Sequence, residues 1–217
     1  MDRELIWCTL NEIEVVLKGH FVGASGKHLD TYINKDGAYT HPLILHDLCR
    51  EMAMPFRGEF EVTVGPEKGG ILLSQGVGFW GETWNDQENS GYTVRSVYAE
   101  KEGDGFAFHR GYDKLLVGKK VLIVEDVLTT GGSVKKVIDA VAKLGGFVVG
   151  VSVICNRGGV KDSDLGSGAP ALPPRLRSLL EIDLSSWEEA DCPLCKQGVP
   201  INTDVGKGRE FIARKKA

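Results

Sequence analysis

The feature that most constrains the fold of this chain is a strand, a tight turn and a helix, followed at once by a second strand. Residues 121–124 are all apolar and form the interior of a predicted strand over 120–125. A helix is predicted over 133–144, where apolar residues fall on one face, and a second apolar strand over 147–154. Short strands that are apolar throughout are typical of parallel sheets, which are covered on both faces. The unit therefore predicts an α/β fold with a parallel, doubly wound sheet and right-handed crossovers.

The alternation of strand and helix extends toward the amino terminus. Strands are predicted over 59–64 and 93–98, and helices over 41–52 and 71–79. A further amphipathic helix is predicted over 4–17, ahead of a stretch of loop and short strands. In such a sheet, ligands bind beyond the carboxyl ends of the strands, so the segments that follow the strands form the candidate site.

Composition and charge narrow the classes of function. The chain has 217 residues, of which 42% are hydrophobic, and a formal net charge of −4. An acidic chain with no basic recognition element is not expected to bind nucleic acid. The sequence shows no apolar run long enough to span a membrane and no charged leader before an apolar stretch. We therefore expect a cytoplasmic protein with no membrane partner.

The junction between the predicted strand over 120–125 and the predicted helix over 133–144 carries the clearest chemical signal. Two acids end the strand, and two threonines, two glycines and a serine lead into the helix. These residues are Glu125, Asp126, Thr129, Thr130, Gly131, Gly132 and Ser133. Unpaired backbone N–H groups at a helix N-terminus bind phosphate, whereas carboxylates accept hydrogen bonds from vicinal hydroxyls. A ribose 5-phosphate, with a phosphate at one end and a diol nearby, suits both halves of the junction.

The same stretch resembles the signature with which type I phosphoribosyltransferases bind 5-phosphoribosyl-1-pyrophosphate (PRPP). It has four apolar residues, two acids, two more apolar residues and then Thr-Thr-Gly-Gly-Ser. The resemblance implies a five-stranded parallel core, a hood built from other segments, and magnesium-bound PRPP as substrate. It also implies that Glu125 and Asp126 hold the ribose hydroxyls and act in catalysis, while residues 129–133 cradle the 5-phosphate.

Two further segments resemble parts of the active site of this family. Residues 64–70 lie where the family has its pyrophosphate-binding loop, and residues 98–111 lie where it has a mobile catalytic loop. Positive charge on such a loop offsets the charge that develops on departing pyrophosphate, and Lys101 is the candidate catalytic cation. The residues of these two segments that we expect to bind PRPP are Lys68, Gly69, Gly70, His109 and Arg110.

The amino-terminal half narrows the resemblance to the orotate phosphoribosyltransferases. Residues 21–34 are similar to the S-G-x-x-S-x-x-Y region of those enzymes, with Leu29 in place of one serine. The resemblance assigns base binding to Lys27, Thr129 and Arg157, and an arginine fork suits the oxygens of orotate. It implies a homodimeric glycosyltransferase of pyrimidine biosynthesis, which converts orotate and PRPP to orotidine 5′-phosphate and pyrophosphate.

Two alternatives to this function stay open. In the first, the chain transfers the phosphoribosyl group to a purine or another base. In the second, the chain is a non-catalytic protein that senses PRPP or nucleotides. The segment over 98–111 is longer and less basic than the catalytic loop of orotate phosphoribosyltransferases, which keeps the second alternative open.

Cys192 and Cys195 have the C-x-x-C spacing of half a zinc site. A complete site needs two more ligands, and the sequence offers no second C-x-x-C and no histidine pair nearby. A metal shared between two subunits, a redox-active loop and a pair of structural thiols are the interpretations that the sequence leaves open.

Gly76, Gly78 and Gly81 match the G-x-G-x-x-G pattern of dinucleotide-binding proteins. In those proteins the glycines lie between a strand and a helix, whereas here they fall within or after a predicted helix. We therefore expect them to be a chance match or to serve close packing.

These predictions describe one phosphoribosyltransferase domain over residues 1–217. Residues 1–40 are expected to supply hood elements, and residues 41–159 the α/β core. Residues 160–217 are expected to form an irregular carboxyl-terminal appendage, which the resemblance does not explain.

Overall fold

The chain divides into two compact units. The computed structural model describes residues 1, 3–23, 25–88, 91, 93–166, 173–182 and 184–216. The first unit contains Met1–Ile6 and His41–Ile182, and the second contains Trp7–Thr40 and Asp183–Ala217. No helix in these described stretches is both long enough and apolar enough to cross a membrane.

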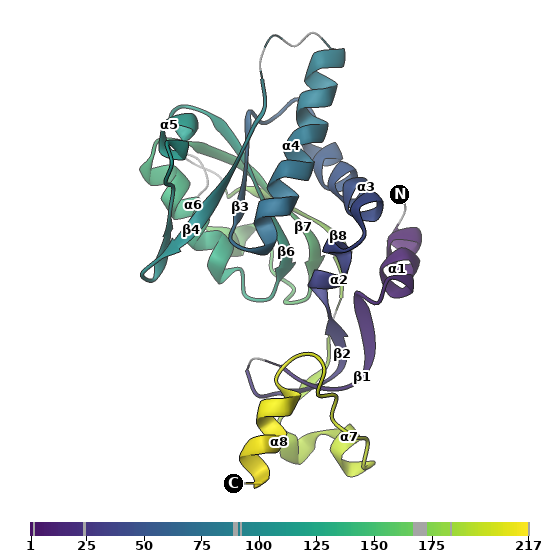
Figure 1. Ribbon diagram of the computed structural model, residues 1–217. Helices are drawn as coiled ribbons and strands as arrows, with labels where there is room; N and C mark the ends of the chain where they lie inside the picture. Colours follow the sequence, from purple (N-terminus) through teal and green to yellow (C-terminus); the bar gives the residue numbers. More distant parts are fainter. Residues whose placement is uncertain are drawn as a thin grey trace. The chain divides into compact units, whose positions relative to one another are not determined.

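A six-stranded sheet with the order β5-β4-β3-β6-β7-β8 forms the centre of the first unit (Figure 1). Its strands are β3 (Val62–Pro66), β4 (Arg95–Glu102), β5 (Gly105–Ala107), β6 (Lys120–Leu128), β7 (Phe147–Asn156) and β8 (Arg175–Glu181). All of them run parallel except the short β5, which pairs antiparallel with β4. The five-stranded parallel core expected from the sequence is therefore confirmed.

Helices pack on both faces of this sheet. Val64 of β3 shares a buried apolar cluster with α6 (Gly132–Lys143). The neighbouring Thr63 points to the opposite face, because side chains alternate along a strand. There its hydroxyl donates to the carbonyl of Ser74 in α4 (Gly69–Gln87) at 2.9 Å. The other helices of this unit are α3 (Pro42–Ala53) and α5 (Tyr112–Leu116), with the 3-10 turns η1 (Met54–Phe56) and η2 (Asp162–Leu165).

The glycines of α4 serve close packing, as predicted. A Cβ atom at Gly76 would lie 2.5 Å from the side chain packed on it, and one at Gly81 would lie 2.7 Å away. A Cβ at Gly78 would overlap the hydroxyl of Ser96 in β4. All three glycines lie inside a helix that is pressed against the sheet, which is not the position of a dinucleotide-binding turn.

An antiparallel sheet of three strands, in the order β1-β2-β9, forms the second unit. The strands are β1 (Val16–Val22), β2 (His28–Ile33) and β9 (Ser186–Trp187). The helices of this unit are α2 (Lys35–Tyr39), α7 (Pro193–Lys196) and α8 (Gly208–Lys216), with the 3-10 turn η3 (Glu189–Asp191); α1 (Arg3–Glu12) begins in the first unit and ends in this one.

The helix predicted over 4–17 ends earlier than expected. α1 stops at Glu12, and Val16 already begins β1. Glu14 has a φ of 56°, a left-handed conformation through which a helix of L-residues does not continue. Val15 and Val16 are β-branched, so they favour an extended strand over the last turn of a helix.

The prediction that residues 160–217 form an irregular appendage is wrong. Arg175–Glu181 forms β8, an edge strand parallel to β7, with Leu176 and Leu180 buried. The Gly- and Pro-rich stretch that was taken for the end of the core only connects β7 to β8, and residues 167–172 of it lie outside the described residues. The first unit therefore extends to Ile182, and the second unit contains residues from both the amino-terminal and the carboxyl-terminal parts of the chain.

Candidate active site

A polar pocket lies at the carboxyl end of β6, where the sequence predicts the ligand. Its volume is about 130 Å³. The residues that line it are Glu125, Val127, Leu128, Thr129, Thr130, Gly131, Gly132, Ser133 and Val134. One continuous segment thus builds this pocket, and β6 holds the segment in place because it is buried between β3 and β7. The carboxyl end of a central parallel strand is the usual place for a ligand in such sheets.

The turn between β6 and α6 has the backbone of an anion site. Gly131 has a φ of 71°, a left-handed conformation that costs glycine little. The N–H of Gly132 donates to Oγ1 of Thr130 at 3.4 Å, which holds the turn against the helix. The N–H groups of the first turn of a helix lack partners within the helix, and its dipole favours an anion there. With the hydroxyls of Thr129 and Ser133, this turn suits a phosphate.

The two acids of the junction occupy different positions. β6 continues to Leu128, beyond the end at 125 that the sequence predicted, so Glu125 and Asp126 lie within a strand and point to opposite faces. Glu125 lines the pocket, whereas Asp126 is 4% exposed and is not among the described residues that line it. A carboxylate oxygen of Asp126 accepts the N–H of Val127 at 2.6 Å. Of the two, Glu125 has the position expected of a group that binds the ribose hydroxyls.

Arg157 directly follows β7 and lies beside this turn. Its backbone N–H donates to the carbonyl of Leu128 at 2.9 Å, which joins the carboxyl ends of β7 and β6. A Cβ at Gly158 would overlap the carbonyl of Thr129, so the two loops touch backbone to backbone. The side-chain amide of Asn156 exchanges hydrogen bonds with the backbone of Val160 at 2.9 and 3.1 Å. The predicted base-binding arginine therefore lies next to the predicted phosphate turn, on a loop that is itself hydrogen-bonded.

The loop after β3, which the sequence predicts to bind pyrophosphate, curls tightly. A Cβ at Gly65 would overlap the backbone of Gly70, so both positions need glycine. Gly69 and Gly70 are buried at the start of α4, while Lys68 is exposed just before it. The peptide bond between Glu67 and Lys68 is cis.

Glu67, which the sequence did not single out, connects this loop to β4. Its N–H donates to the carbonyl of Ala99 at 2.9 Å, and its carboxylate accepts the N–H of Lys101 at 2.7 Å. The loop that carries Lys68 and the strand that carries Lys101 are therefore hydrogen-bonded to each other. The sequence contains no signal for this link, because it depends on the parallel pairing of β3 with β4.

The predicted mobile segment over 98–111 forms a hairpin. β4 and β5 pair antiparallel, with Gly103 at the turn in a left-handed conformation. At the tip, the carboxylate of Asp104 lies 2.6 Å from Nζ of Lys136 in α6. The hydrogen bond from Lys136 is the main cause that lowers the pKa of Asp104. One solvent-exposed ion pair thus connects the tip of the hairpin to α6.

The basic side chains of the segment over 98–111 are exposed. Nε2 of His109 lies 3.3 Å from the carboxylate of Glu102, and Nε of Arg110 lies 3.3 Å from that of Glu100. The hydrogen bond to Glu100 is the main cause that raises the pKa of Arg110. Lys101 is exposed as well. These positions leave Lys101, His109 and Arg110 open to solvent and to an anionic ligand.

Lys27, the third predicted base-binding residue, belongs to the second unit. It follows the turn after β1, and its ammonium lies 3.4 Å from a carboxylate oxygen of Glu188. Both side chains are exposed.

The cysteine pair also belongs to the second unit, and two histidines lie against it. His20 and His28 place a ring nitrogen within 3.4–3.8 Å of a cysteine sulfur. The expectation that the chain offers no histidine pair for Cys192 and Cys195 is therefore wrong. The two histidines come from β1 and β2, so only the folded chain brings them to the cysteines.

Comparison with known proteins agrees with this geometry. Residues 44–165 match a family model described as the phosphoribosyl transferase domain. The orotate phosphoribosyltransferase of Caldanaerobacter subterraneus subsp. tengcongensis is 36% identical over 202 residues, which are 93% of this chain and 96% of that protein. That of Thermotoga maritima is 34% identical over 200 residues, which are 92% of this chain and 96% of that protein.

A solved structure shows the same fold. The Mycobacterium tuberculosis orotate phosphoribosyltransferase in complex with Fe(III) dicitrate has a TM-score of 0.61 at 24% identity, covering 84% of this chain and 97% of that one. The family model spans more than half of this chain, and the relatives match it over nearly its whole length. The chain belongs to the type I phosphoribosyltransferase family, close to the orotate phosphoribosyltransferases.

Proposed function

We propose that this chain transfers the 5-phosphoribosyl group of PRPP to orotate, which yields orotidine 5′-phosphate and pyrophosphate. The observation that carries the proposal is the pocket at the β6–α6 junction, where Glu125 and the turn over 129–133 lie together and Arg157 follows in the adjoining loop. The relatives named above, which match nearly the whole chain, are orotate phosphoribosyltransferases and support this choice of base.

In this proposal, each part of the site holds one part of PRPP. The backbone N–H groups and hydroxyls over 129–133 bind the 5-phosphate, and Glu125 accepts hydrogen bonds from the ribose hydroxyls. Lys68, Gly69 and Gly70 bind the pyrophosphate, with His109 and Arg110 adding positive charge from the hairpin. A structure of the Mycobacterium tuberculosis enzyme with PRPP shares the fold, which supports PRPP as the ligand.

The reaction exchanges one bond at the anomeric carbon of the ribose. The bond from this carbon to the pyrophosphate oxygen breaks, and pyrophosphate leaves with the electron pair. A ring nitrogen of orotate forms the new bond, and the proton of this nitrogen is released to solvent. Positive charge develops on the ribose, where the carboxylate of Glu125 stabilises it, while Lys101 stabilises the negative charge on the leaving group. Asp126 is not among the described residues that line the pocket, and its carboxylate accepts the N–H of Val127, so we propose that it acts by positioning the strand.

Arg157 and Thr129 are the proposed base-binding residues of the first unit, and Lys27 is that of the second. The guanidinium of Arg157 presents paired donors that match the carboxylate and carbonyl oxygens of orotate. A purine lacks the carboxylate, so this recognition favours orotate over purine bases.

Magnesium is the proposed cofactor. The carboxylate of Glu125 and the hydroxyls of Thr129 and Thr130 give the pocket oxygen donors, the type that Mg²⁺ prefers. The metal would be held mainly by PRPP oxygens, with Glu125 nearby, and when bound it neutralises charge on the pyrophosphate.

We further propose that the chain acts as a homodimer in the cytoplasm. Its small-molecule partners are PRPP and orotate, and it has no nucleic-acid partner. All five cysteines lie in the described part of the chain and none of them is in a disulfide, which suits a reducing compartment. The acidic net charge of −4 supports the absence of a nucleic-acid partner.

Release of pyrophosphate from PRPP tests the proposal. The purified chain is assayed with Mg²⁺ and, separately, with orotate, uracil, adenine, guanine and hypoxanthine. We expect release with orotate alone, and none with a chelator that removes Mg²⁺. Release with a purine would shift the assignment to another base, and no release with any base, despite PRPP binding, would make the chain a PRPP-sensing protein.

A further inference from the structure

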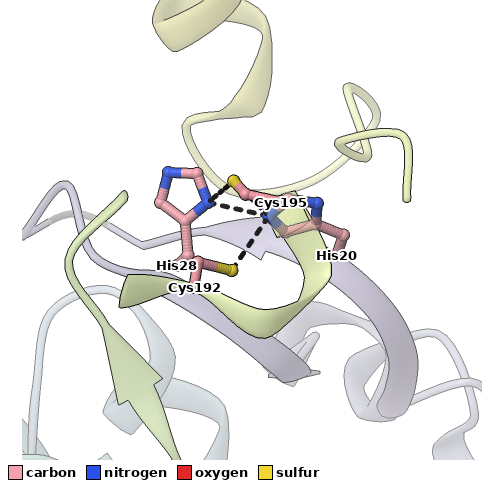
Figure 2. A group of neighbouring side chains, drawn as sticks. All are labelled: His20, His28, Cys192 and Cys195. Atoms are coloured by element: carbon pink, nitrogen blue, oxygen red, sulfur yellow. Dashed lines mark hydrogen bonds between the residues drawn. The ribbon is translucent and has the colours of Figure 1, made fainter. Parts of the chain in front are cut away.

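Four potential metal ligands converge in the second unit (Figure 2). His20 lies on β1 and His28 on β2, while Cys192 and Cys195 lie at the start and inside of α7. One ligand atom from each of these residues lies within 4.8 Å of all the others. Figure 2 shows Nε2 of His20, Nδ1 of His28 and both sulfurs turned toward one another. His20 and Cys192 are 172 positions apart in the sequence, so only the fold makes this group.

The distances between these atoms suit a small tetrahedral metal ion. Sγ of Cys192 lies 3.6 Å from Nε2 of His20, and Sγ of Cys195 lies 3.8 Å from the same atom and 3.4 Å from Nδ1 of His28. Tetrahedral bond lengths of zinc to sulfur and nitrogen imply sulfur-to-nitrogen distances of about 3.6 Å. The two ring nitrogens are 2.7 Å apart and would separate by about 0.6 Å around a tetrahedral zinc ion.

Burial of these polar side chains costs free energy unless a ligand at their centre binds them. Cys192 and His28 have no exposed surface, and His20 is 2% exposed. Polar groups that leave water need partners, yet within the described structure the ring nitrogens and thiols of this group mainly face each other.

A backbone carbonyl fixes the ligand atom of His20. Nδ1 of His20 lies 2.7 Å from the carbonyl oxygen of Val199, so this nitrogen carries the proton and donates it. Nε2 is then unprotonated and has a lone pair for a metal. A second hydrogen bond of this kind orients most histidine ligands of zinc sites. The N–H of Asn202 also donates to the carbonyl of His20 at 2.7 Å, which ties the loop after α7 to β1.

We propose that His20, His28, Cys192 and Cys195 bind one structural Zn²⁺ ion within a single chain. Two thiolates and two imidazoles in tetrahedral arrangement select zinc over magnesium or calcium, which prefer oxygen. The protein supplies all four ligands, and three of them are buried, which is typical of a structural site and not of a catalytic one. The ion joins the β1–β2 hairpin to the carboxyl-terminal segment, and so stabilises a unit too small to bury a large apolar core.

Metal analysis of the full-length protein tests this site. The chain is purified with reduced thiols and its zinc is measured by mass spectrometry. We expect about one zinc ion per chain, and almost none in His20→Ala or Cys195→Ser. Cys8→Ser is the matched control, because Cys8 is an exposed cysteine outside the group and its loss leaves the zinc content unchanged. A reduced wild-type chain that contains no zinc and takes none up on titration overturns the proposal.

Two measurements on the wild-type chain keep the test independent of how well the variants fold. Substitution with Co²⁺ should give the thiolate-to-metal charge-transfer band and the intense visible bands of a tetrahedral site, and the weak spectrum of an octahedral site overturns the proposal. A zinc chelator should also raise alkylation of Cys195 several-fold. Cys49 and Cys155 stay unreactive in either case, because burial raises the pKa of each thiol to about 12. Alkylation of Cys195 that is the same with and without chelator counts against a bound metal.

Discussion

The N–H of Arg157 donates to the carbonyl of Leu128 at 2.9 Å. The loop after β7 is therefore hydrogen-bonded to the end of β6, just before the turn over 129–133. This bond links the group proposed to read the base to the group proposed to hold the sugar phosphate. A transferase needs such a link, because the base nitrogen must be held against the anomeric carbon of the bound ribose.

The first prediction concerns Arg157. Replacing it with alanine should lower kcat/KM for orotate about 100-fold, because a charge-assisted hydrogen-bond pair contributes up to about 3 kcal/mol. The KM for PRPP should change little, since the phosphate turn is intact. Steady-state kinetics with each substrate varied measures both. Arg177→Ala, an exposed arginine on β8, is the control and should behave as the wild type. Equal losses for the two substrates would contradict the assignment of Arg157 to the base.

Glu125 and Asp126 should respond differently to removal of their charge. Glu125→Gln should lower kcat about 100-fold with little change in Tm, because Glu125 lines the pocket and its carboxylate is proposed to stabilise the charged ribose. Asp126→Asn should lower Tm more than Glu125→Gln does, since Asp126 is buried and accepts the N–H of Val127. Kinetics and thermal unfolding of both variants check this. A larger kinetic loss in Asp126→Asn with unchanged Tm would reverse the two roles.

Lys101 is the predicted catalytic cation of the hairpin. Lys101→Ala should reduce kcat by about 10- to 100-fold. The attraction between the Lys101 ammonium and the leaving pyrophosphate is strongest in the transition state, where the negative charge develops. The stability of the fold should not change, since the side chain is exposed. Lys114→Ala replaces another exposed lysine of this unit and serves as the control. Turnover by Lys101→Ala at the wild-type rate would remove Lys101 from the mechanism.

A pH-dependent contribution to stability is expected from Glu61, which precedes β3. The hydrogen bond from Nζ of Lys119 is the main cause that lowers the pKa of Glu61, and the N–H of Lys120 adds to it. Because the folded-state pKa lies below the unfolded one, the stabilisation is present above the unfolded pKa and is lost as the pH falls through the folded pKa. Glu61→Gln should therefore cost up to about 1 kcal/mol at neutral pH, since the pair is partly exposed. Urea unfolding of both proteins should give converging stabilities in acid; a constant difference would contradict this assignment.

Much of the fold and of the phosphate turn can be predicted because their signals are local. The apolar strand, the glycine-rich turn and the amphipathic helix are contiguous, so β6, the turn and α6 follow from one short stretch. β8 is different: it is short, carries Arg175, Arg177 and Ser178 among its leucines, and follows a Gly- and Pro-rich connection. Its place in the sheet therefore depends on pairing with β7.

The parts of the site that the sequence did not reveal depend on distant contacts. Nothing in the sequence distinguishes His20 and His28 from other strand residues. Only the folded chain places Cys192 and Cys195 against them. β6 extends three residues beyond 125, and side chains alternate along a strand. Glu125 therefore lines the pocket, whereas Asp126 is not among its described lining residues. Strand ends are the least certain feature of any pattern-based prediction, because pairing with neighbours decides them.

The most direct test is a crystal structure of the chain with PRPP and Mg²⁺. The account predicts density for the 5-phosphate within hydrogen-bond distance of the backbone N–H groups over 129–133, with the ribose hydroxyls against Glu125. PRPP bound elsewhere, or an empty turn at saturating PRPP, would contradict it.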